Sequence, residues 1–300
     1  LPFKIFKILE SYLNDRTFYV KYIDKTSALH AVKSGVPQGS ILGPILYLIY
    51  TADIPIPSNQ HSMIATFADD TVLLSSHIDI SIASSILQNI LNDVIEWFDK
   101  WNLKINEDKT IQVIYTNKSN LNATHISIRN TVLNVSNSAK YLGLHIDKNL
   151  SWKFHIDAKC KQLRLKLREV YWLLSPKSSL SLENKLLIYK MILKPIWTYG
   201  IELWGTAAMS NLKPIQSLQS KILRIIVNAD RFIPNQVIHR DLKIPLVTEE
   251  IATRSESYIS RLMFHQNPQI QNIPLQEQSR GRRLKKLRPS DLRFRFQNQQ

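Results

Sequence analysis

The chain has 300 residues, 44% of them hydrophobic, and its 39 basic and 24 acidic side chains give a formal net charge of +15. A chain of this length can bury a real core, and the excess positive charge indicates a polyanionic partner, with nucleic acid favoured over a membrane surface. No apolar run approaches the roughly 20 residues needed to span a bilayer, LPFKIF lacks signal-peptide architecture, and the single cysteine excludes a disulfide framework, so we expect an intracellular protein.

The first third of the chain predicts a helix, a hairpin and an unusual loop. Apolar residues at helical spacing predict a helix over residues 1–13, and β-prone runs at 18–23 and 29–33 predict a hairpin around the turn-like DKTS. The segment SGVPQGSILGP (34–44) holds three of the seven glycines and two prolines, which indicates a special backbone conformation. Its Pro44 suits the first turn of a helix, and the following apolar segment, 45–52, could lie beneath a sheet.

Two adjacent carboxylates interrupt the next apolar stretch, TFADDTVLLS. Asp69 and Asp70 lie between β-prone runs at 63–67 and 71–74, a pattern that predicts a hairpin with the carboxylates at or beside its apex. Aspartates are also common in ordinary turns, because they bond their own backbone. Held together in mostly apolar surroundings, however, two like charges cost energy that a divalent cation offsets. Mg²⁺ fits best, since it prefers carboxylate oxygens, water and phosphates, and it points to phosphoryl transfer by two ions.

Beyond the carboxylates the pattern is mixed and then helical. Apolar residues at helical spacing predict a helix over 82–101, and short β-prone runs predict strands at 111–115, 126–128, 132–135 and 141–146. From Ser151 onward the pattern predicts helices, with others at 182–193 and 212–227. The first of these helices has an apolar stripe with spacings of 4, 3, 4, 3 and 4, made of Ile156, Cys160, Leu163, Leu167, Val170 and Leu174.

Two groups of basic residues are candidates for contact with a polyanion. Lys161, Arg164 and Arg168 fall on a different side of their helix from the apolar stripe, where they form either a solvated charged face or a binding ridge. The tail RGRRLKKLRPSDLRFR (280–295) carries eight basic residues and one acidic residue. This tail is either a solvated, disordered end, or a nucleic-acid arm or nuclear-localisation signal.

Four motifs in this order resemble those of reverse transcriptases, and more narrowly the polymerases of jockey-like non-LTR retrotransposons. They are SGVPQGSILGPILY (34–47), FADD (67–70), WNLKINEDKT (101–110) and YLGLHIDKNLSW (141–152). In addition, KPIWTYGIELWG (194–205) resembles the segment that follows the polymerase core. The resemblance implies an α+β fold: a polymerase palm, with an antiparallel sheet packed on helices, in residues 1–150, a mostly α-helical thumb and following helical region in 151–275, and a basic, disordered C-terminal extension in 276–300.

The resemblance also assigns roles to individual residues. It makes Asp69 a ligand of the two catalytic Mg²⁺ ions, with Asp70 close by in support, and Lys109 the proton donor to the pyrophosphate leaving group. For Lys109, a surface lysine in a turn is the alternative. The glycine-rich loop would contact the templating base and incoming nucleotide through Pro37, Gln38, Gly39 and Ser40. Leu142 and Gly143 match the primer-grip hairpin, although packing in a core strand would also explain Leu142, and Lys161, Arg164 and Arg168 would hold duplex phosphates.

One departure from the family concerns the metal site. The family has a third metal-binding aspartate on a strand upstream of the helix that precedes the glycine-rich loop, and this sequence begins inside that helix. Asp15, Asp24 and Asp53 come after that position, so none of them matches it. Because removal of one catalytic ligand commonly costs orders of magnitude in rate, we expect an N-terminally truncated polymerase fragment that is inactive by itself.

The resemblance therefore implies an RNA-directed DNA polymerase of a mobile element that uses Mg²⁺. Its partners would be an RNA template, a DNA primer, the RNA–DNA duplex and deoxynucleoside triphosphates, without a membrane and with an open oligomeric state; both nucleus and cytoplasm fit. The alternative is a non-catalytic, nucleic-acid-binding remnant of a retrotransposon. An RNA-templated RNA polymerase or an intron maturase would share the paired aspartates, but the segment at 194–205 argues against both.

Overall fold

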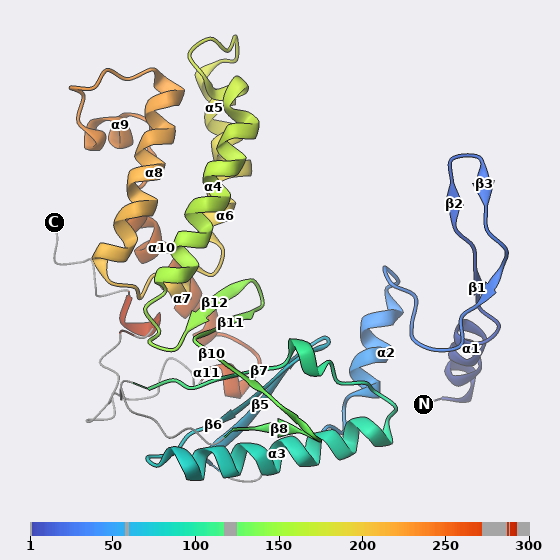
Figure 1. The fold of residues 1–300 in the computed structure, drawn as a ribbon. Coiled ribbons are helices and arrows are strands. Elements are labelled where there is room, and N and C mark those ends of the chain that lie inside the picture. Colours follow the sequence, from blue (N-terminus) through green and yellow to red (C-terminus); the bar gives the residue numbers. More distant parts are fainter. Residues whose placement is uncertain (1, 58–59, 117–124, 272–286, 288, 293–300) are drawn as a thin grey trace. The chain divides into compact units, whose positions relative to one another are not determined.

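The computed structural model describes residues 2–57, 60–116, 125–271, 287 and 289–292. The chain divides into two compact units, which we describe separately: unit 1 is Leu1–Glu107 with Asn122–Val132, and unit 2 is Asp108–Leu121 with Leu133–Gln300. Helices and small two-stranded sheets make up both units, in agreement with the predicted α+β class (Figure 1). In the described part of the chain, no helix is both long and apolar enough to cross a membrane.

Unit 1 combines three α-helices with four short antiparallel strand pairs in its described residues: β1 with β4, β2 with β3, β5 with β6, and β8 with β9. In chain order the elements are α1 (Phe3–Leu13), β1 (Thr17–Phe18), β2 (Lys21–Tyr22), β3 (Lys25–Thr26), β4 (His30–Ala31), α2 (Leu42–Tyr50), β5 (Ser62–Phe67), β6 (Asp70–Ser75), α3 (Ile80–Lys100), β8 (Ser127–Ile128) and β9 (Thr131–Val132). The short 3-10 helix η1 (Glu107–Lys109) spans the sequence boundary between the two units.

Helix α3 is the main support of unit 1. It confirms the helix predicted over 82–101, and its buried side chains include Val94 and Trp97. Helix α3 lies along the β5–β6 hairpin and β8 (Figure 1). The Gln88 amide fixes β8 to this helix, because it accepts a hydrogen bond from the Ser127 N–H and donates one to the Ser127 carbonyl, both at 2.9 Å. Helix α3 therefore packs against both the β5–β6 hairpin and β8.

The remaining parts of unit 1 bury less than their sequences suggest. Helix α1 confirms the helix predicted over 1–13, but none of its described residues is buried. Helix α2 has Pro44 in its first turn, as predicted, yet only Gly43 is buried, so the expectation that 45–52 lies beneath a sheet is wrong within the described residues. The hairpin predicted around DKTS forms instead as two short ladders, and its turn lies at Ile23–Asp24.

Unit 2 is mostly helical. Its elements are β7 (Ile111–Val113), β10 (Asn134–Ser136), β11 (Ser138–Tyr141), β12 (Leu144–Asp147), α4 (Lys153–Leu174), α5 (Leu182–Ile188), the π-helix η2 (Tyr189–Leu193), α6 (Lys194–Thr198), α7 (Ile201–Trp204), α8 (Met209–Val227), α9 (Asn235–Asp241), α10 (Val247–Met263), α11 (Pro268–Gln271) and the 3-10 helix η3 (Pro289–Asp291). Strands β11 and β12 pair antiparallel, whereas β7 and β10 pair in parallel, unlike the antiparallel sheet that was predicted.

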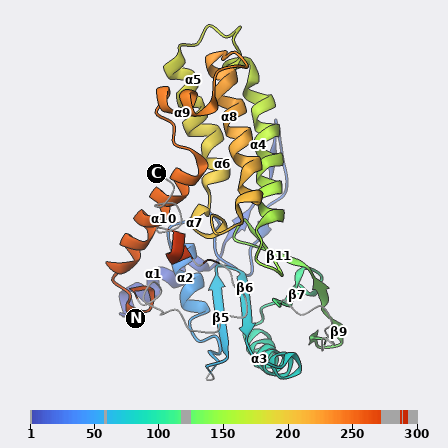
Figure 2. The ribbon, with the colours of Figure 1, turned by 90° about the vertical axis from the view of Figure 1, so that its left-hand side faces the viewer.

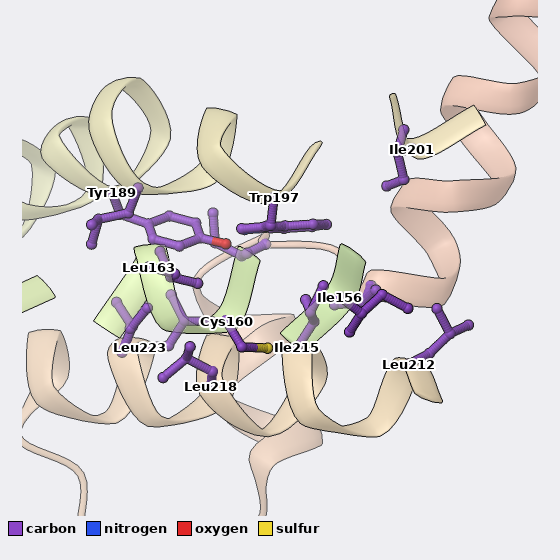
Figure 3. Packing of buried hydrophobic residues seen from close by; sticks show 14 of the residues in the cluster. Ile156, Cys160, Leu163, Tyr189, Trp197, Ile201, Leu212, Ile215, Leu218 and Leu223 are labelled. Carbon is purple, nitrogen blue, oxygen red and sulfur yellow. The ribbon is translucent and has the colours of Figure 1, made fainter. Parts of the chain in front are cut away.

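The core of unit 2 surrounds α4, whose predicted apolar stripe is confirmed, because all six of its residues are buried. Helices α4, α6 and α8 lie side by side (Figure 2). Figure 3 shows Cys160 and Leu163 between Tyr189 and Trp197 on one side and Leu218 on the other. Burial of each large apolar side chain contributes about 1.5–3 kcal/mol, so this cluster holds the helices firmly together.

Three further predictions for unit 2 can be compared with the structure. The single strand predicted over 141–146 is wrong, because Leu142–Gly143 forms a turn between β11 and β12. The helix predicted over 182–193 is confirmed as α5 continued by η2. Most of the basic tail, 276–300, lies outside the described residues, but within it Leu292 is fully buried and belongs to the hydrophobic cluster of unit 2.

Candidate active site

The two predicted catalytic aspartates lie at the end of the β5–β6 hairpin. Phe67 pairs with Asp70, which leaves Ala68 and Asp69 as a two-residue turn, so the predicted apex position is confirmed. Ala68 has φ +51°, in the left-handed region, as the first residue of such tight turns requires. An alanine in this region costs about 1 kcal/mol relative to ordinary conformations. The hairpin therefore holds the backbone before Asp69 in a conformation that alanine alone would not favour.

Both carboxylates are exposed, as is Phe67, with 62% of its surface accessible. The expectation that an apolar environment raises the electrostatic cost of the pair is therefore wrong for the described residues, because water reaches both groups. Exposure also leaves the carboxylate oxygens accessible to a ligand. Within the described ranges, no group of three or more His, Cys, Asp or Glu side chains could hold a metal ion. Unit 1 thus offers two hard oxygen donors of the kind that Mg²⁺ prefers, as part of a ligand set.

Tyr47 on α2 is electrostatically coupled to the hairpin apex. Burial, and then the negative charge of Asp69, raise the pKa of the Tyr47 hydroxyl above its usual value. The hydroxyl therefore stays protonated at neutral pH and can donate a hydrogen bond. Tyr47 ends the motif SGVPQGSILGPILY, but no role could be assigned to it from the sequence alone. The one feature of the sequence that could have identified Tyr47 is its position, one helical turn after Gly43.

The glycine-rich loop has a defined internal structure in front of α2. The Ser40 hydroxyl donates to the Pro37 carbonyl at 2.8 Å and accepts from the Gly43 N–H at 3.0 Å. A Cβ on Gly43 would lie 2.9 Å from Ser40 Oγ, so this arrangement needs glycine. Gln38 and Gly39 are exposed at the turn, and Gly39 has φ +83°. The loop thus presents Gln38 and Gly39 outward while Pro37 and Ser40 brace it.

Arg16 anchors the start of this loop and was not identified from the sequence. Its guanidinium donates to the Leu13 carbonyl at 2.9 Å and to the Gly35 carbonyl at 2.6 Å, and so joins the end of α1 to the loop. Among the other nearby carboxylates, Asp53 accepts a hydrogen bond from the Trp97 indole at 3.1 Å, which gives it a structural role. A single arginine between a helix and a hairpin carries no distinctive sequence signal.

The predicted primer-grip residues form a tight turn in unit 2. Tyr141 pairs with Leu144, and both turn residues have positive φ, +46° for Leu142 and +76° for Gly143. These values are typical of a type I′ hairpin turn, in which leucine is unusual. Packing in a core strand, the alternative explanation for Leu142, is therefore excluded. The Tyr199 hydroxyl donates to the Leu142 carbonyl at 2.7 Å, which fixes the turn from outside.

The segment around Tyr199 supports this hairpin closely. A Cβ on Gly143 would lie 3.3 Å from the Tyr199 ring, and one on Gly200 would lie 2.7 Å from Leu144 Cδ2. Gly200 also has φ +65°. The motif KPIWTYGIELWG therefore contributes a hydroxyl and a glycine that hold the β11–β12 turn. The sequence contained this signal, but it did not show which hairpin the segment contacts.

The other predicted site residues are all exposed in unit 2. Lys109 is the last residue of η1, with an exposed side chain. Lys161, Arg164 and Arg168 lie on α4 away from its buried stripe, and none of these three forms an ion pair within the described residues. Their position fits both a solvated face and a surface for phosphates, so the role of this face stays a prediction.

Comparison with known proteins identifies the region that contains these motifs. Residues 2–146 match the family model described as "Reverse transcriptase (RNA-dependent DNA polymerase)". Among curated proteins, the chain is 40% identical over 296 residues to the probable RNA-directed DNA polymerase from transposon X-element of Drosophila melanogaster, covering 97% of this chain and 32% of that protein. It is 34% identical over 272 residues to the RNA-directed DNA polymerase from mobile element jockey of the same species, covering 89% and 30%.

A third relative, the probable RNA-directed DNA polymerase from transposon BS of Drosophila melanogaster, is 36% identical over 271 residues, covering 88% of this chain and 30% of that protein. The chain spans about a third of the length of these curated relatives. No solved structure matches it. The resemblance read from the four motifs is confirmed: the chain belongs to the reverse transcriptases of non-LTR mobile elements.

Proposed function

We propose that this chain is part of an RNA-directed DNA polymerase that copies the RNA of a mobile element into DNA. The observation that carries the proposal is the β5–β6 apex, which presents Asp69 and Asp70 to solvent inside the region that matches the family. In this proposal, residues 1–150 act as a polymerase palm and the helices that follow act as a thumb. The RNA template, DNA primer and deoxynucleoside triphosphates are its substrates.

Asp69 and Asp70 would hold Mg²⁺ with carboxylate oxygens. Bound Mg²⁺ would neutralise phosphate charge and make the primer 3′ hydroxyl a better nucleophile. The protonated Tyr47 hydroxyl would donate a hydrogen bond close to Asp69 and so help to orient the groups bound there. Lys109 would supply a proton to the leaving pyrophosphate. Each of these roles depends on a chain that also supplies the family's third aspartate, upstream of this sequence.

The remaining predicted residues would bind nucleic acid. The braced loop of Pro37 and Ser40 would present Gln38 and Gly39 to the templating base and the incoming nucleotide. The turn at Leu142–Gly143 would support the primer end through its backbone. The exposed basic residues of α4, Lys161, Arg164 and Arg168, would contact phosphates without reading sequence, as cationic side chains on nucleic-acid backbones do.

The test is primer extension on an RNA template with Mg²⁺ and labelled deoxynucleotides, using a chain extended upstream to include the family's third aspartate. We expect Asp69→Ala to reduce extension by at least three orders of magnitude, because it removes a metal ligand. Asp24→Ala is a matched control. Asp24 also follows a residue of positive φ, Ile23 at +55°, in a two-residue hairpin turn, and its replacement should leave extension unchanged.

Extension that persists in the Asp69→Ala variant would refute the assignment of this hairpin. The 300-residue chain alone should bind primer–template without extending it. If the extended chain also binds without extending, the alternative of a non-catalytic nucleic-acid-binding remnant gains support over the polymerase.

A further inference from the structure

Three basic side chains of unit 2 gather beside the β11–β12 turn, and none of them has an acidic partner in the part of the chain that the structure describes. Lys140 on β11 and His145 on β12 are direct cross-strand partners in the ladder. The third is Lys159, on the first half of α4, the helix against which β12 packs (Figure 1). We call Lys140, His145 and Lys159 the hairpin basic cluster. Like charges held close together destabilise a fold, so Lys140 and Lys159, and His145 whenever it is protonated, repel one another in the free protein.

Burial and neighbouring positive charge both act on the pKa values of two members of the hairpin basic cluster. Burial, followed by the charge of Lys140, lowers the pKa of Lys159. Burial, followed by the charges of Lys140 and Lys159, also lowers the pKa of His145. In each case the charged neighbours that act on the group are cations. A bound anion would reverse these effects by offsetting the repulsion.

No carboxylate compensates the cluster in the described residues, where none of its three members forms an ion pair. The acidic residues nearest in sequence are Asp157, two positions from Lys159 on α4 and in no ion pair with it, and Asp147, two positions along β12 from His145. The Asp147 carboxylate is occupied by the following loop, because it accepts hydrogen bonds from the Ser151 N–H at 3.0 Å and from the Trp152 N–H at 2.8 Å. The positive charge of the cluster is therefore left for an external partner.

The cluster is also held in place relative to the turn. Lys159 Nζ lies 5.4 Å from the centroid of the Tyr199 ring, within the range of a cation–π interaction, and the same tyrosine donates its hydroxyl to the Leu142 carbonyl. The His145 ring packs edge-on against Phe154, with centroids 5.1 Å apart. The side chains of Lys159 and His145 are only partly exposed, so less entropy is lost when they bind a ligand.

We propose that Lys140, His145 and Lys159 bind a phosphodiester of the primer strand next to the turn at Leu142–Gly143. The anionic chemistry of the ligand follows from the unpaired cations, whereas the identity of the strand rests on the proposed function, in which this turn supports the primer. The lysines supply charge and the imidazole supplies a hydrogen-bond donor. Through Lys159 and Tyr199, a bound phosphate is connected to the Leu142 carbonyl, so that binding and turn geometry reinforce each other.

The test measures binding of a fluorescently labelled DNA primer, annealed to an RNA template, to the 300-residue chain by anisotropy at several salt concentrations. Lys140→Gln combined with Lys159→Gln should weaken binding roughly tenfold and make the slope of log K against log salt shallower by about 1 to 2. The matched control combines Lys177→Gln and Lys213→Gln, which removes the same charge from exposed lysines elsewhere in unit 2 and should change binding less than twofold.

Two further measurements complete the design. Neutral methylphosphonate linkages at the 3′ end of the primer should abolish the difference between wild type and the cluster variant, whereas the same linkages in the template should preserve it. The melting temperature of the cluster variant should stay close to that of wild type, because the repulsion that is removed offsets the lost contact of Lys159 with the Tyr199 ring. Binding equal to that of the control variant, or a difference abolished by the template linkages, would each overturn the proposal.

Failure of this proposal and failure of the polymerase function give different results. Loss of the binding difference, with primer extension intact in the upstream-extended chain, would remove the cluster and keep the polymerase. Absence of extension, with the binding difference intact, would remove the polymerase and keep a phosphate-binding cluster.

Discussion

His155 predicts a specific loss of stability in acid. His155 is fully buried at the start of α4, and the centroid of its ring lies 6.1 Å from that of Trp152 and 6.4 Å from that of Trp204. Its Nδ1 accepts a hydrogen bond from the His145 N–H at 3.2 Å, which places the proton of the neutral ring on Nε2. Burial, and then the charges of Lys159 and His145, lower the pKa of His155 from 6.5 to about 4.

The size of the effect follows from the difference between these two pKa values. Between pH 4 and pH 6.5 the unfolded chain binds a proton at this site and the folded chain does not, so stability falls as the pH is lowered. Relative to pH 7.5, His155 should lower the free energy of unfolding by about 2 kcal/mol at pH 5, and by about 3 kcal/mol below pH 4. The loss is absent above pH 7, where the ring is neutral in both states.

Urea unfolding of unit 2, followed by tryptophan fluorescence at pH 7.5, 6 and 5, measures this loss. His155→Asn keeps an acceptor for the His145 N–H but cannot titrate, so it should be less stable at pH 7.5 and lose about 2 kcal/mol less than wild type on going to pH 5. His265→Asn, the same change at an exposed position, should keep the wild-type pH dependence. If His155→Asn and wild type lose equal stability between pH 7.5 and 5, the assignment of a buried neutral His155 is refuted.

Two other substitutions test the packing of unit 2. Gly200→Ala should lower the free energy of unfolding by about 2 kcal/mol in a denaturant titration, because φ is +65° and the new Cβ would lie 2.7 Å from Leu144 Cδ2. Gly35→Ala is the control: φ is +78° but the space around the new Cβ is open, so the free energy of unfolding should fall by only about 1 kcal/mol. Equal losses in the two variants would contradict the contact with Leu144. Glu250→Gln should lower the free energy of unfolding, measured by calorimetry, by about 2–3 kcal/mol, because it leaves the partly buried Lys194, 2.8 Å away, without its countercharge. Glu256→Gln changes an exposed position on the same helix, and an equal loss of stability in the two variants would disprove this role of Glu250.

The parts of the fold that the sequence predicted are those in which a local pattern and the tertiary packing agree. The 4–3 stripe of α4 required only that one face of a long helix be buried, and all six residues are. Helix α3 followed for the same reason. By contrast, α1 and α2 have apolar side chains such as Phe3, 73% exposed, and Leu48, 64% exposed, that the described residues do not cover. Periodicity located these helices but could not show what packs on them.

The parts of the candidate site whose chemistry depends on residue type could be predicted from the sequence. The parts that depend on contacts between distant residues could not. The carboxylates at 69 and 70 and the glycines of the loop can be read directly from the motifs. The support given by Arg16 to Gly35, and by Tyr199 to Leu142, joins residues 19 and 57 positions apart in the chain. A single sequence contains no periodicity or spacing that reports such pairs, so these contacts required the structure.

The turns show why hairpin chemistry was only partly predictable. Four two-residue turns occur in the described residues, at Ile23–Asp24, Ala68–Asp69, Arg129–Asn130 and Leu142–Gly143, and their first residues have φ of +55°, +51°, +52° and +46°. The usual signals for such turns, Asn-Gly or Asp-Gly, are absent from all four, so the strain of about 1 kcal/mol in each must be offset by the surrounding structure.

The structure shows how this strain is offset at two of these four turns. At Ala68–Asp69 the six-residue ladder of β5 and β6 fixes the register on α3, and at Leu142–Gly143 the Tyr199 hydroxyl bonds the strained residue itself. Strained residues that the surrounding structure holds in place tend to occur at functional sites. These two turns are also those that lie within the reverse transcriptase motifs, whereas Ile23–Asp24 and Arg129–Asn130 lie outside them. Geometry and motif together, rather than either alone, therefore distinguish Asp69 from Asp24, and the paired substitutions of these aspartates test that distinction directly.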